Sequence, residues 1–235
     1  MRILLAILCV LLFGVVAVTA SGSAPLAAGP AQVLMPRYTP MPAVAPLALP
    51  DVGDRGARTY VRLWSAFALP LEGWDVPADV ELLPGAARDY RGGIHEGIDF
   101  PAPSGTPVLA AASGTIARAD VSFLDWNREQ QEIALYEALT LGYTPAATLD
   151  RIRGRQVWID HGKGVITRYA HLSAVESSLY VGQKIEAGSL IGEVGSSGYP
   201  QGGPHLHFEV RVGDDFYGDG LAGDALVQAV SRLFR

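Results

Sequence analysis

The stretch GPHLHFEVRV, residues 203–212, alternates in the manner of a β-strand and carries two histidines on one side of the chain. Residues two apart in a strand project to the same face, so His205 and His207 point the same way, about 6.6 Å apart, and Leu206 points to the opposite face. Two imidazoles side by side on a buried face are destabilising unless a metal or a proton chemistry uses them. The stretch therefore predicts a strand that carries a functional site.

Short β-rich runs separated by glycine surround this strand from residue 107 onward. The segment VGQKIEAGSLIGEVGSSG, residues 181–198, places glycines at the spacing that tight hairpins require. We therefore expect a mainly β fold, a two-layer antiparallel β-sheet or sandwich. The expected strands are residues 108–112, 115–119, 156–160, 165–170, 190–194 and 206–212.

Residues 120–154 interrupt the β pattern with signals for a first helix. Asn127 with Gln130 resembles a capping box that begins the helix, and Gly142 supplies its end. Between these signals apolar residues recur three apart, at Ile133, Tyr136 and Leu139.

A second short helix is predicted to follow, with Thr144 as its cap, Pro145 in its first turn and an end before Gly154. The two helices predict a helical hairpin inserted between two strands. It is either a surface insertion with a small core of its own or a wall beside a binding groove. Residues 222–235 predict a closing C-terminal helix that packs Leu226, Val230 and Leu233.

The first twenty residues, MRILLAILCVLLFGVVAVTA, have the pattern of an export signal. They combine a basic start at Arg2, an apolar run over residues 3–18 and a small-residue exit. The run is shorter than the roughly 20 residues that a spanning helix needs, so a cleaved signal is favoured over a retained N-terminal anchor. Residues 21–58, rich in proline and alanine, predict an extended linker, which leaves residues 59–235 as the folded domain.

The net charge and the cysteine content argue against several classes of function. The chain of 235 residues has a formal net charge of −6, which does not support binding to nucleic acid or to an anionic membrane. Membrane contact is expected only through the N-terminal segment, if that segment is not cleaved. The single cysteine, Cys9, lies inside the export signal, so the mature chain has no thiolate nucleophile and no internal disulfide. We expect a monomer.

A second motif, GGIHEGIDFPAP at residues 92–103, places His95 and Asp99 four apart. It is not the H-E-x-x-H zinc helix, because position 99 is aspartate and Pro101 would break a helix. In a fully extended chain the two side chains would stand about 13 Å apart, too far to share an ion. The chain must therefore bend between them, and Gly97 is the residue that allows a bend. The motif H-x-G-x-D thus predicts a turn that leads into a strand, with both side chains converging.

Four side chains of the two motifs, those of His95, Asp99, His205 and His207, are of the types that bind a dication such as zinc. Four protein ligands would close a tetrahedral site and make it structural, whereas a hydrolytic site keeps one position for water. One of the four should therefore be a neighbour of the metal and not a ligand. His171, at the end of the expected strand 165–170, is a further candidate for the site.

Three motifs together carry a resemblance to a known family: H-x-G-x-D at 95–99, VWIDHGKGVITRYAHLS at 157–173 and GPHLHFEV at 203–210. They resemble the lysostaphin-type zinc endopeptidases of bacterial cell walls, the M23 or LytM-like peptidases, over roughly residues 91–211. The resemblance implies that His95, Asp99 and His207 hold one zinc ion per chain. It also implies that His171 and His205 are catalytic and flank the water that the metal activates.

The same resemblance implies a LytM-like fold and the substrate. It indicates an exported, cell-envelope or secreted zinc metalloendopeptidase that hydrolyses the peptide crosslinks of bacterial peptidoglycan. The alternative is a non-catalytic LytM-like module that binds or activates another cell-wall hydrolase. A carrier domain of the biotinyl or lipoyl type is a remote alternative, because Lys184 lacks the flanking residues that cofactor attachment needs.

Other polar residues near the motifs are expected to be structural. His161 lies in a predicted hairpin turn, where a non-catalytic role is expected. Arg91 and Glu96 could face the substrate, but a surface salt bridge is the simpler expectation for both.

Overall fold

The computed structural model describes residue 63 and residues 66–235. The predicted export signal at residues 1–20 and the predicted linker at residues 21–58 lie outside these residues, as do residues 59–62 and 64–65 of the predicted domain. The strands are β1 Ala87–Arg88, β2 Gly93–Ile94, β3 Ile98–Pro101, β4 Pro107–Leu109, β5 Gly114–Ala119, β6 Val157–Asp160, β7 Val165–Ala170, β8 Ala174–Val175, β9 Lys184–Ile185, β10 Leu190–Glu193, β11 His205–Val212 and β12 Asp215–Phe216. The helices are η1 Val80–Leu82, η2 Asp89–Arg91, α2 Arg128–Leu141, α3 Ala146–Arg153, η3 Pro200–Gly202 and α4 Gly223–Leu233.

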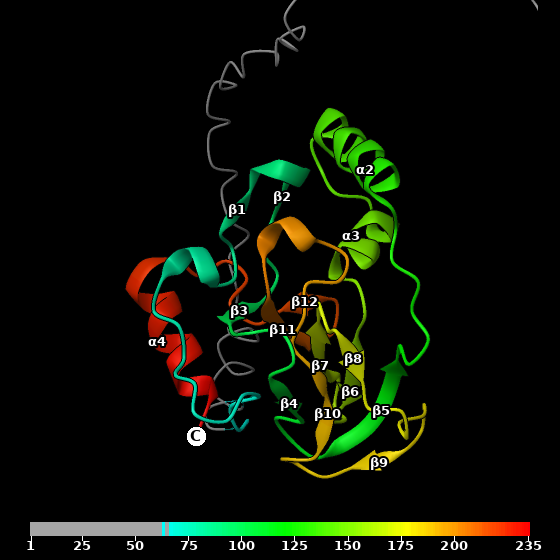
Figure 1. The fold of residues 1–235 in the computed structure, drawn as a ribbon. Helices are drawn as coiled ribbons and strands as arrows, with labels where there is room; N and C mark the ends of the chain where they lie inside the picture. Colours follow the sequence, from blue (N-terminus) through cyan, green and yellow to red (C-terminus); the bar gives the residue numbers. More distant parts are fainter. Residues whose placement is uncertain (1–62, 64–65) are drawn as a thin grey trace, which may run out of the picture. The chain divides into compact units, whose positions relative to one another are not determined.

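A seven-stranded antiparallel sheet forms the centre of the domain (Figure 1). Its order is β12-β11-β7-β6-β5-β9, and β3 pairs with β11 beside this path. Strand β11 is the longest, and buried residues fill its middle because β3 and β7 both pair with it. All six strands that the sequence predicted are present, and none of their bounds differs by more than three residues.

A three-stranded antiparallel sheet, in the order β4-β10-β8, shares its core with the central sheet. Val108 of β4 and Ile191 of β10 belong to the same cluster of buried side chains as Ile159 and Tyr169 of the central sheet. The burial of this apolar surface is the main stabilising contribution to such a domain. The prediction of a mainly β, antiparallel fold in two layers is confirmed.

The inserted helical hairpin is present as α2 and α3, between β5 and β6. The capping box at the start of α2 forms as predicted, because the Asn127 side chain accepts from Gln130 N and the Gln130 side chain accepts from Asn127 N. The predicted cap of α3 is wrong. Thr144 donates its hydroxyl to the Arg91 carbonyl oxygen, and Pro145 takes the capping position without a side-chain bond.

The C-terminal helix α4 lies on the other side of the domain from α2 and α3 (Figure 1). It buries Leu226, Val230 and Leu233, as the sequence predicted. Within the part of the chain that the structure describes, no helix is both long enough and apolar enough to cross a membrane.

Candidate metal centre

The pairing of β3 with β11 brings the two sequence motifs together. In this antiparallel register Asp99 lies directly opposite His207, and Pro101 lies opposite His205. Leu206 is fully buried in the core, so the two histidines that flank it share the opposite face of β11, as the sequence predicted. Residues more than a hundred positions apart thus become cross-strand neighbours.

The loop between β2 and β3 carries His95 back towards β11 across Gly97. A Cβ atom on Gly97 would lie 2.6 Å from the Phe208 carbonyl oxygen and 2.9 Å from His207 Cε1. Gly97 is not among the glycines with a positive φ. The bend that the sequence predicted is present, but glycine is required there for close approach to β11 and not for a left-handed backbone.

Three side-chain atoms converge at this point. His95 Nε2 lies 2.9 Å from Asp99 Oδ1, His207 Nδ1 lies 2.8 Å from the same oxygen, and the two ring nitrogens are 3.0 Å apart. A tetrahedral zinc ion with bonds of about 2.1 Å separates its ligand atoms by about 3.4 Å. The three atoms are therefore spaced almost as one small dication would need them.

The outer nitrogens of both imidazoles are committed to acceptors. His95 Nδ1 lies 2.9 Å from the Leu83 carbonyl oxygen, and His207 Nε2 lies 3.0 Å from Glu209 Oε1. A carbonyl or an ionised carboxylate can only accept, so these two outer nitrogens carry protons, and in the neutral rings that a metal needs the inner nitrogens keep their lone pairs. Three electron-pair donors then face one another, an arrangement that a metal cation stabilises. The donor set fits zinc.

The pKa shifts of Asp99 and His207 agree with a cation at this position. Burial opposes ionisation of Asp99, but the His95 and His207 imidazoles hold its pKa well below the usual range. Burial would lower the pKa of His207, yet hydrogen bonds to Asp99 and Glu209 raise it to about 9 when no metal is present. The surroundings of the His207 ring thus favour positive charge.

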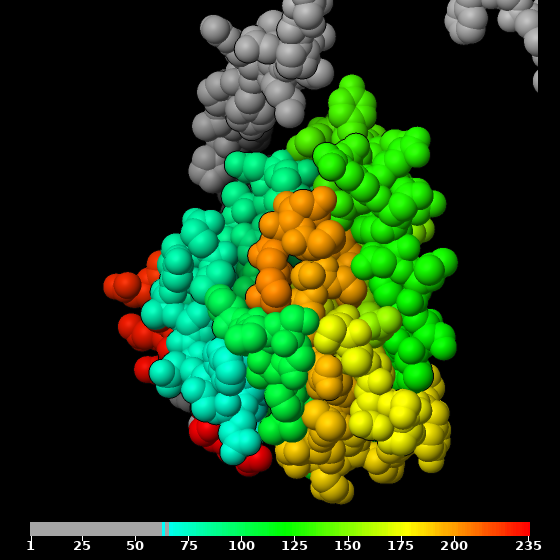
Figure 2. All heavy atoms as spheres, viewed as in Figure 1, coloured from blue at the N-terminus to red at the C-terminus, as the bar shows by residue number. Residues whose placement is uncertain are grey.

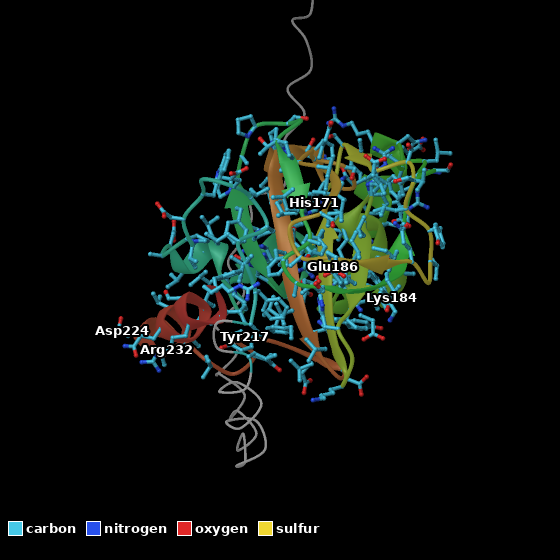
Figure 3. The ribbon with its side chains drawn as sticks, turned by 90° about the horizontal axis from the view of Figure 1, so that it is seen from below. His171, Lys184, Glu186, Tyr217, Asp224 and Arg232 are labelled. Atoms are coloured by element: carbon cyan, nitrogen blue, oxygen red, sulfur yellow. The ribbon has the colours of Figure 1, made fainter. Side chains whose placement is uncertain are left out.

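His171 and His205 lie beside these three residues. The His171 ring centroid is 4.6 Å from that of His205 and 5.7 Å from that of His207. His171 Nδ1 donates to the Ser197 carbonyl oxygen and His205 Nδ1 donates to that of Gly203, both at 2.9 Å. Each ring therefore keeps a lone pair on Nε2. Figure 3 shows His171 in the interior, far from Asp224 and Arg232 of α4.

The backbone conformation and the pKa of His171 are both unusual. Its φ is 60°, in the left-handed region, which non-glycine residues rarely adopt and which often marks functional sites. Burial, and then the positive charge that His205 and His207 can carry, lower the pKa of His171 to about 3. The imidazole is therefore neutral at physiological pH, as a proton acceptor must be.

A cavity of about 420 Å³ opens onto all five residues. Its walls come from the region of η1 to β3, from α3, and from the loop that contains η3. Figure 2 shows the surface hollowed beside the orange segment that contains Pro200–Gly202. The stacked rings of Tyr90 and Tyr199, with centroids 4.4 Å apart, join two of these walls.

Residues 93–217 match the family model described as Peptidase family M23. The chain belongs to this family. The curated relatives include DD-carboxypeptidase/endopeptidase Mpg of Neisseria meningitidis, 36% identical over 119 residues, which are 51% of this chain and 20% of the relative. Peptidoglycan DD-endopeptidase ShyA of Vibrio cholerae is 32% identical over 118 residues, 50% of this chain and 20% of the relative. The chain thus spans about a fifth of the length of the curated relatives that it matches.

Solved structures of M23 proteins also match part of the chain. The catalytic domain of lysostaphin from Staphylococcus simulans is 30% identical, with a TM-score of 0.35, over 51% of this chain and 68% of that one. The catalytic domain of the prophage-encoded M23 protein EnpA from Enterococcus faecalis, solved as a point mutant, is 27% identical with a TM-score of 0.37, over 52% of this chain and 74% of that one.

Several residues of this candidate site were missed in the sequence. Glu209 is fully buried and accepts from His207, and it stands two residues beyond His207 on the same face of β11. The spacing of two along a strand could have indicated it. Arg88, whose Nη2 lies 3.1 Å from Asp99 Oδ2, and Arg153 carry no signal in the sequence, because only the folded chain brings them to the site.

Arg91 and Glu96, each expected in a surface salt bridge, form a salt bridge with each other that is largely buried. Arg91 Nη2 lies 2.8 Å from Glu96 Oε2, and the two side chains are only 4% and 12% exposed. Arg91 also donates to Thr144, which ties η2 to the loop between α2 and α3. The pair therefore supports the wall of the cavity.

His161 lies away from the cavity. Its Nδ1 contacts the Ser113 carbonyl oxygen at 2.9 Å and its Nε2 contacts the Thr167 hydroxyl at 2.8 Å. These contacts join β7 to the turn before β5, in keeping with the structural role expected for His161.

Proposed function

We propose that this M23 protein is an exported zinc-dependent endopeptidase that hydrolyses the peptide crosslinks of bacterial peptidoglycan. The observation that carries the proposal is the convergence of three electron-pair donors, on His95, Asp99 and His207, beside two further imidazoles in one cavity. We assign the zinc to the first three residues and proton transfer to His171 and His205.

This assignment of zinc to three protein ligands is compatible with a catalytic role of the metal. Zinc supplies Lewis-acid polarisation of a carbonyl oxygen and promotes the ionisation of water near neutral pH. Three protein ligands are the number found in catalytic zinc sites, whereas structural sites have four. His205 is the residue set apart as a neighbour, because its Nε2 lies 3.8 Å from Asp99 Oδ1 while the three assigned atoms lie within 3.0 Å of one another.

Two histidines are positioned to move protons. The Nδ1 protons of His171 and His205 are held by backbone carbonyls, so Nε2 of either ring accepts the proton of the attacking water as general base. The imidazolium so formed gives its proton to the leaving amine. The hydrogen bonds at Nδ1 fix the tautomer and the ring orientation through both steps.

The names of the relatives support the substrate. ShyA and Mpg are named as peptidoglycan DD-endopeptidase and DD-carboxypeptidase/endopeptidase. An extracytoplasmic location follows from such a substrate and agrees with the export signal predicted at residues 1–20. All five site positions hold the residues that the chemistry needs, which favours an enzyme over the non-catalytic LytM-like alternative.

Digestion of purified peptidoglycan tests the proposal. The protein is incubated with peptidoglycans of several crosslink types, with and without a zinc chelator, and the released fragments are identified by mass spectrometry. We expect cleavage of a peptide bond in at least one type, with loss of activity in chelator and recovery on adding zinc.

A His205→Ala variant controls for a contaminating hydrolase. It should retain the metal and release no fragments. If the wild type binds zinc, yet cuts no crosslink and instead stimulates another wall hydrolase, the non-catalytic alternative replaces the proposal.

A further inference from the structure

Arg153, the last residue of the inserted helix α3, is buried although the insertion lies at the edge of the domain. The end of α3 is seated tightly on the loop that leads to β11. Gly154 follows with a φ of 66°, and a Cβ there would lie 2.3 Å from the Ser197 carbonyl oxygen. The helix end therefore has little freedom to move relative to that loop.

The side chain of Arg153 reaches Glu209, which contacts the His207 ring on the edge opposite Asp99. Its Nε lies 2.5 Å from Glu209 Oε1. The same oxygen accepts the Nε2 proton of His207 at 3.0 Å. Arg153, Glu209 and His207 thus form a continuous chain of contacts that ends at an assigned metal ligand.

The main chain of Arg153 contacts the other half of the site. Its carbonyl oxygen accepts from His171 N at 2.8 Å, at the residue whose backbone is left-handed. One residue of the insertion therefore touches both the support of a metal ligand and the backbone of a proposed general base.

Two other arginines near Glu209 do not duplicate the contact. Arg168 Nη1 and Arg211 Nη1 lie 3.4 Å and 3.7 Å from the other carboxylate oxygen, Oε2. They offset the buried charge at Oε2, whereas Arg153 is the arginine that contacts Oε1, the oxygen that accepts from His207.

We propose that Arg153 is a positioning residue of the metal centre, which through Glu209 holds the His207 ring with Nδ1 turned towards Asp99 and His95. The inference rests on the proposed function only in assigning a metal to these three residues. It gives the helical hairpin a role: the insertion supplies part of the support of the site and is more than a wall beside the groove.

Metal affinity measured without substrate tests this role. Zinc affinity is determined by competition with a chromophoric chelator for the full-length protein and for the Arg153→Gln, Arg153→Lys and Arg151→Gln variants. The spectrum of bound cobalt reports ligand geometry, and circular dichroism confirms folding. Arg151, on the same helix, lies over the Trp126 ring and provides a matched loss of charge.

Arg153→Gln should weaken zinc binding by about 10- to 100-fold, as the loss of a partner that orients a metal-binding histidine does, and should alter the cobalt spectrum. Arg151→Gln should stay within about twofold of wild type. Charge alone predicts the opposite sign, because removing a positive group near a dication strengthens its binding. Unchanged or tighter zinc binding by Arg153→Gln would overturn the proposal.

Arg153→Lys keeps the charge, so it provides a second test if the glutamine variant does not fold. Lysine lacks the guanidinium fork, and we expect a loss of affinity smaller than that of Arg153→Gln but above twofold. Wild-type affinity in a folded Arg153→Lys variant, when Arg153→Gln does not fold, would contradict the positioning role. A wild type that binds no metal would instead contradict the proposed function itself.

Discussion

Gly97 lies where the chain between His95 and Asp99 passes closest to β11. The contacts around it are with the Phe208 backbone and the His207 ring, so an added methyl group cannot be absorbed by a flexible side-chain end. We expect Gly97→Ala to shift either His207 or the loop that carries His95. A displacement of about 1 Å in a reacting constellation costs about 100-fold in rate, and we expect kcat/KM to fall by that factor.

Gly105→Ala is the control for this prediction. Gly105 has a φ of 87° and no atom within 4 Å of an added Cβ, so alanine there strains the backbone without touching the site. It should lower the free energy of unfolding by about 1 kcal/mol and leave kcat/KM unchanged. Equal activity in the two alanine variants would contradict the close-approach account of Gly97.

The depressed pKa of His171 predicts acid sensitivity of the metal-free fold. The pKa is about 3 in the folded state and about 6.5 in the unfolded chain, so between these values the unfolded state binds the extra proton. The free energy of unfolding therefore falls as the pH drops. From pH 7 to pH 5 the loss from this residue is about 2 kcal/mol.

Denaturant unfolding of the metal-free wild type and of His171→Asn, at pH 7 and at pH 5, measures this loss. Asparagine tolerates the left-handed backbone and does not titrate, so the variant should lose about 2 kcal/mol less than wild type over this interval. Parallel pH dependence of the two proteins would show that His171 is not held neutral by its burial.

At the scale of elements, α2 shows what a sequence pattern can and cannot specify. Its capping box and its end at Gly142 are local features and were predicted. The direction of its faces was not predicted. Ile133, Tyr136 and Leu139 are 62%, 74% and 48% exposed, whereas Gln131 and Ala138 are buried.

The orientation of α2 is decided by polar contacts with the loop before β11. Gln131 Nε2 donates to the Gly198 carbonyl oxygen at 2.8 Å, and Gln201 Nε2 donates to Gln131 Oε1 at 2.5 Å. Such contacts between distant segments cannot be read from the spacing of apolar residues along one helix.

Paired substitutions on α2 test this orientation. Tyr136→Gln should change the free energy of unfolding by less than about 0.5 kcal/mol, because the side chain is exposed. Gln131→Leu should lower it by about 1–3 kcal/mol, because buried partners lose their hydrogen bonds. Denaturant titration of the two variants measures both effects, and a larger loss from Tyr136→Gln would mean that the exposed side of α2 is buried in solution.

The longer strands of the central sheet, β5, β6, β7 and β11, were predictable because their β-rich runs have glycine at one or both ends. The two-residue strands β1, β2, β8, β9 and β12 were not predicted, because two residues carry no alternation. Strand β3 was expected only as a strand that follows the turn at residues 95–99, without bounds and without a partner. It is defined by its pairing with β11, and the partner of a strand is not written in the strand itself.

At the scale of the whole molecule, the parts of the site that stand in local motifs were predictable, and the parts that depend on contacts between distant segments were not. The five histidine and aspartate positions stand in short motifs, so the sequence identified them. Arg88, Arg153 and the stacked pair of Tyr90 and Tyr199 reach the cavity from separate segments. Their roles depend on long-range packing, which no motif records.

The metal content of the purified protein tests the central claim most directly. We expect about one zinc ion per chain in the wild type and in His205→Ala, and a loss of bound zinc in His95→Ala, Asp99→Ala and His207→Ala. His205→Ala should be inactive although it is loaded with metal. A wild type that takes up no zinc, or a folded His207→Ala variant that retains a full equivalent, would contradict the assignment of these three side chains to one ion.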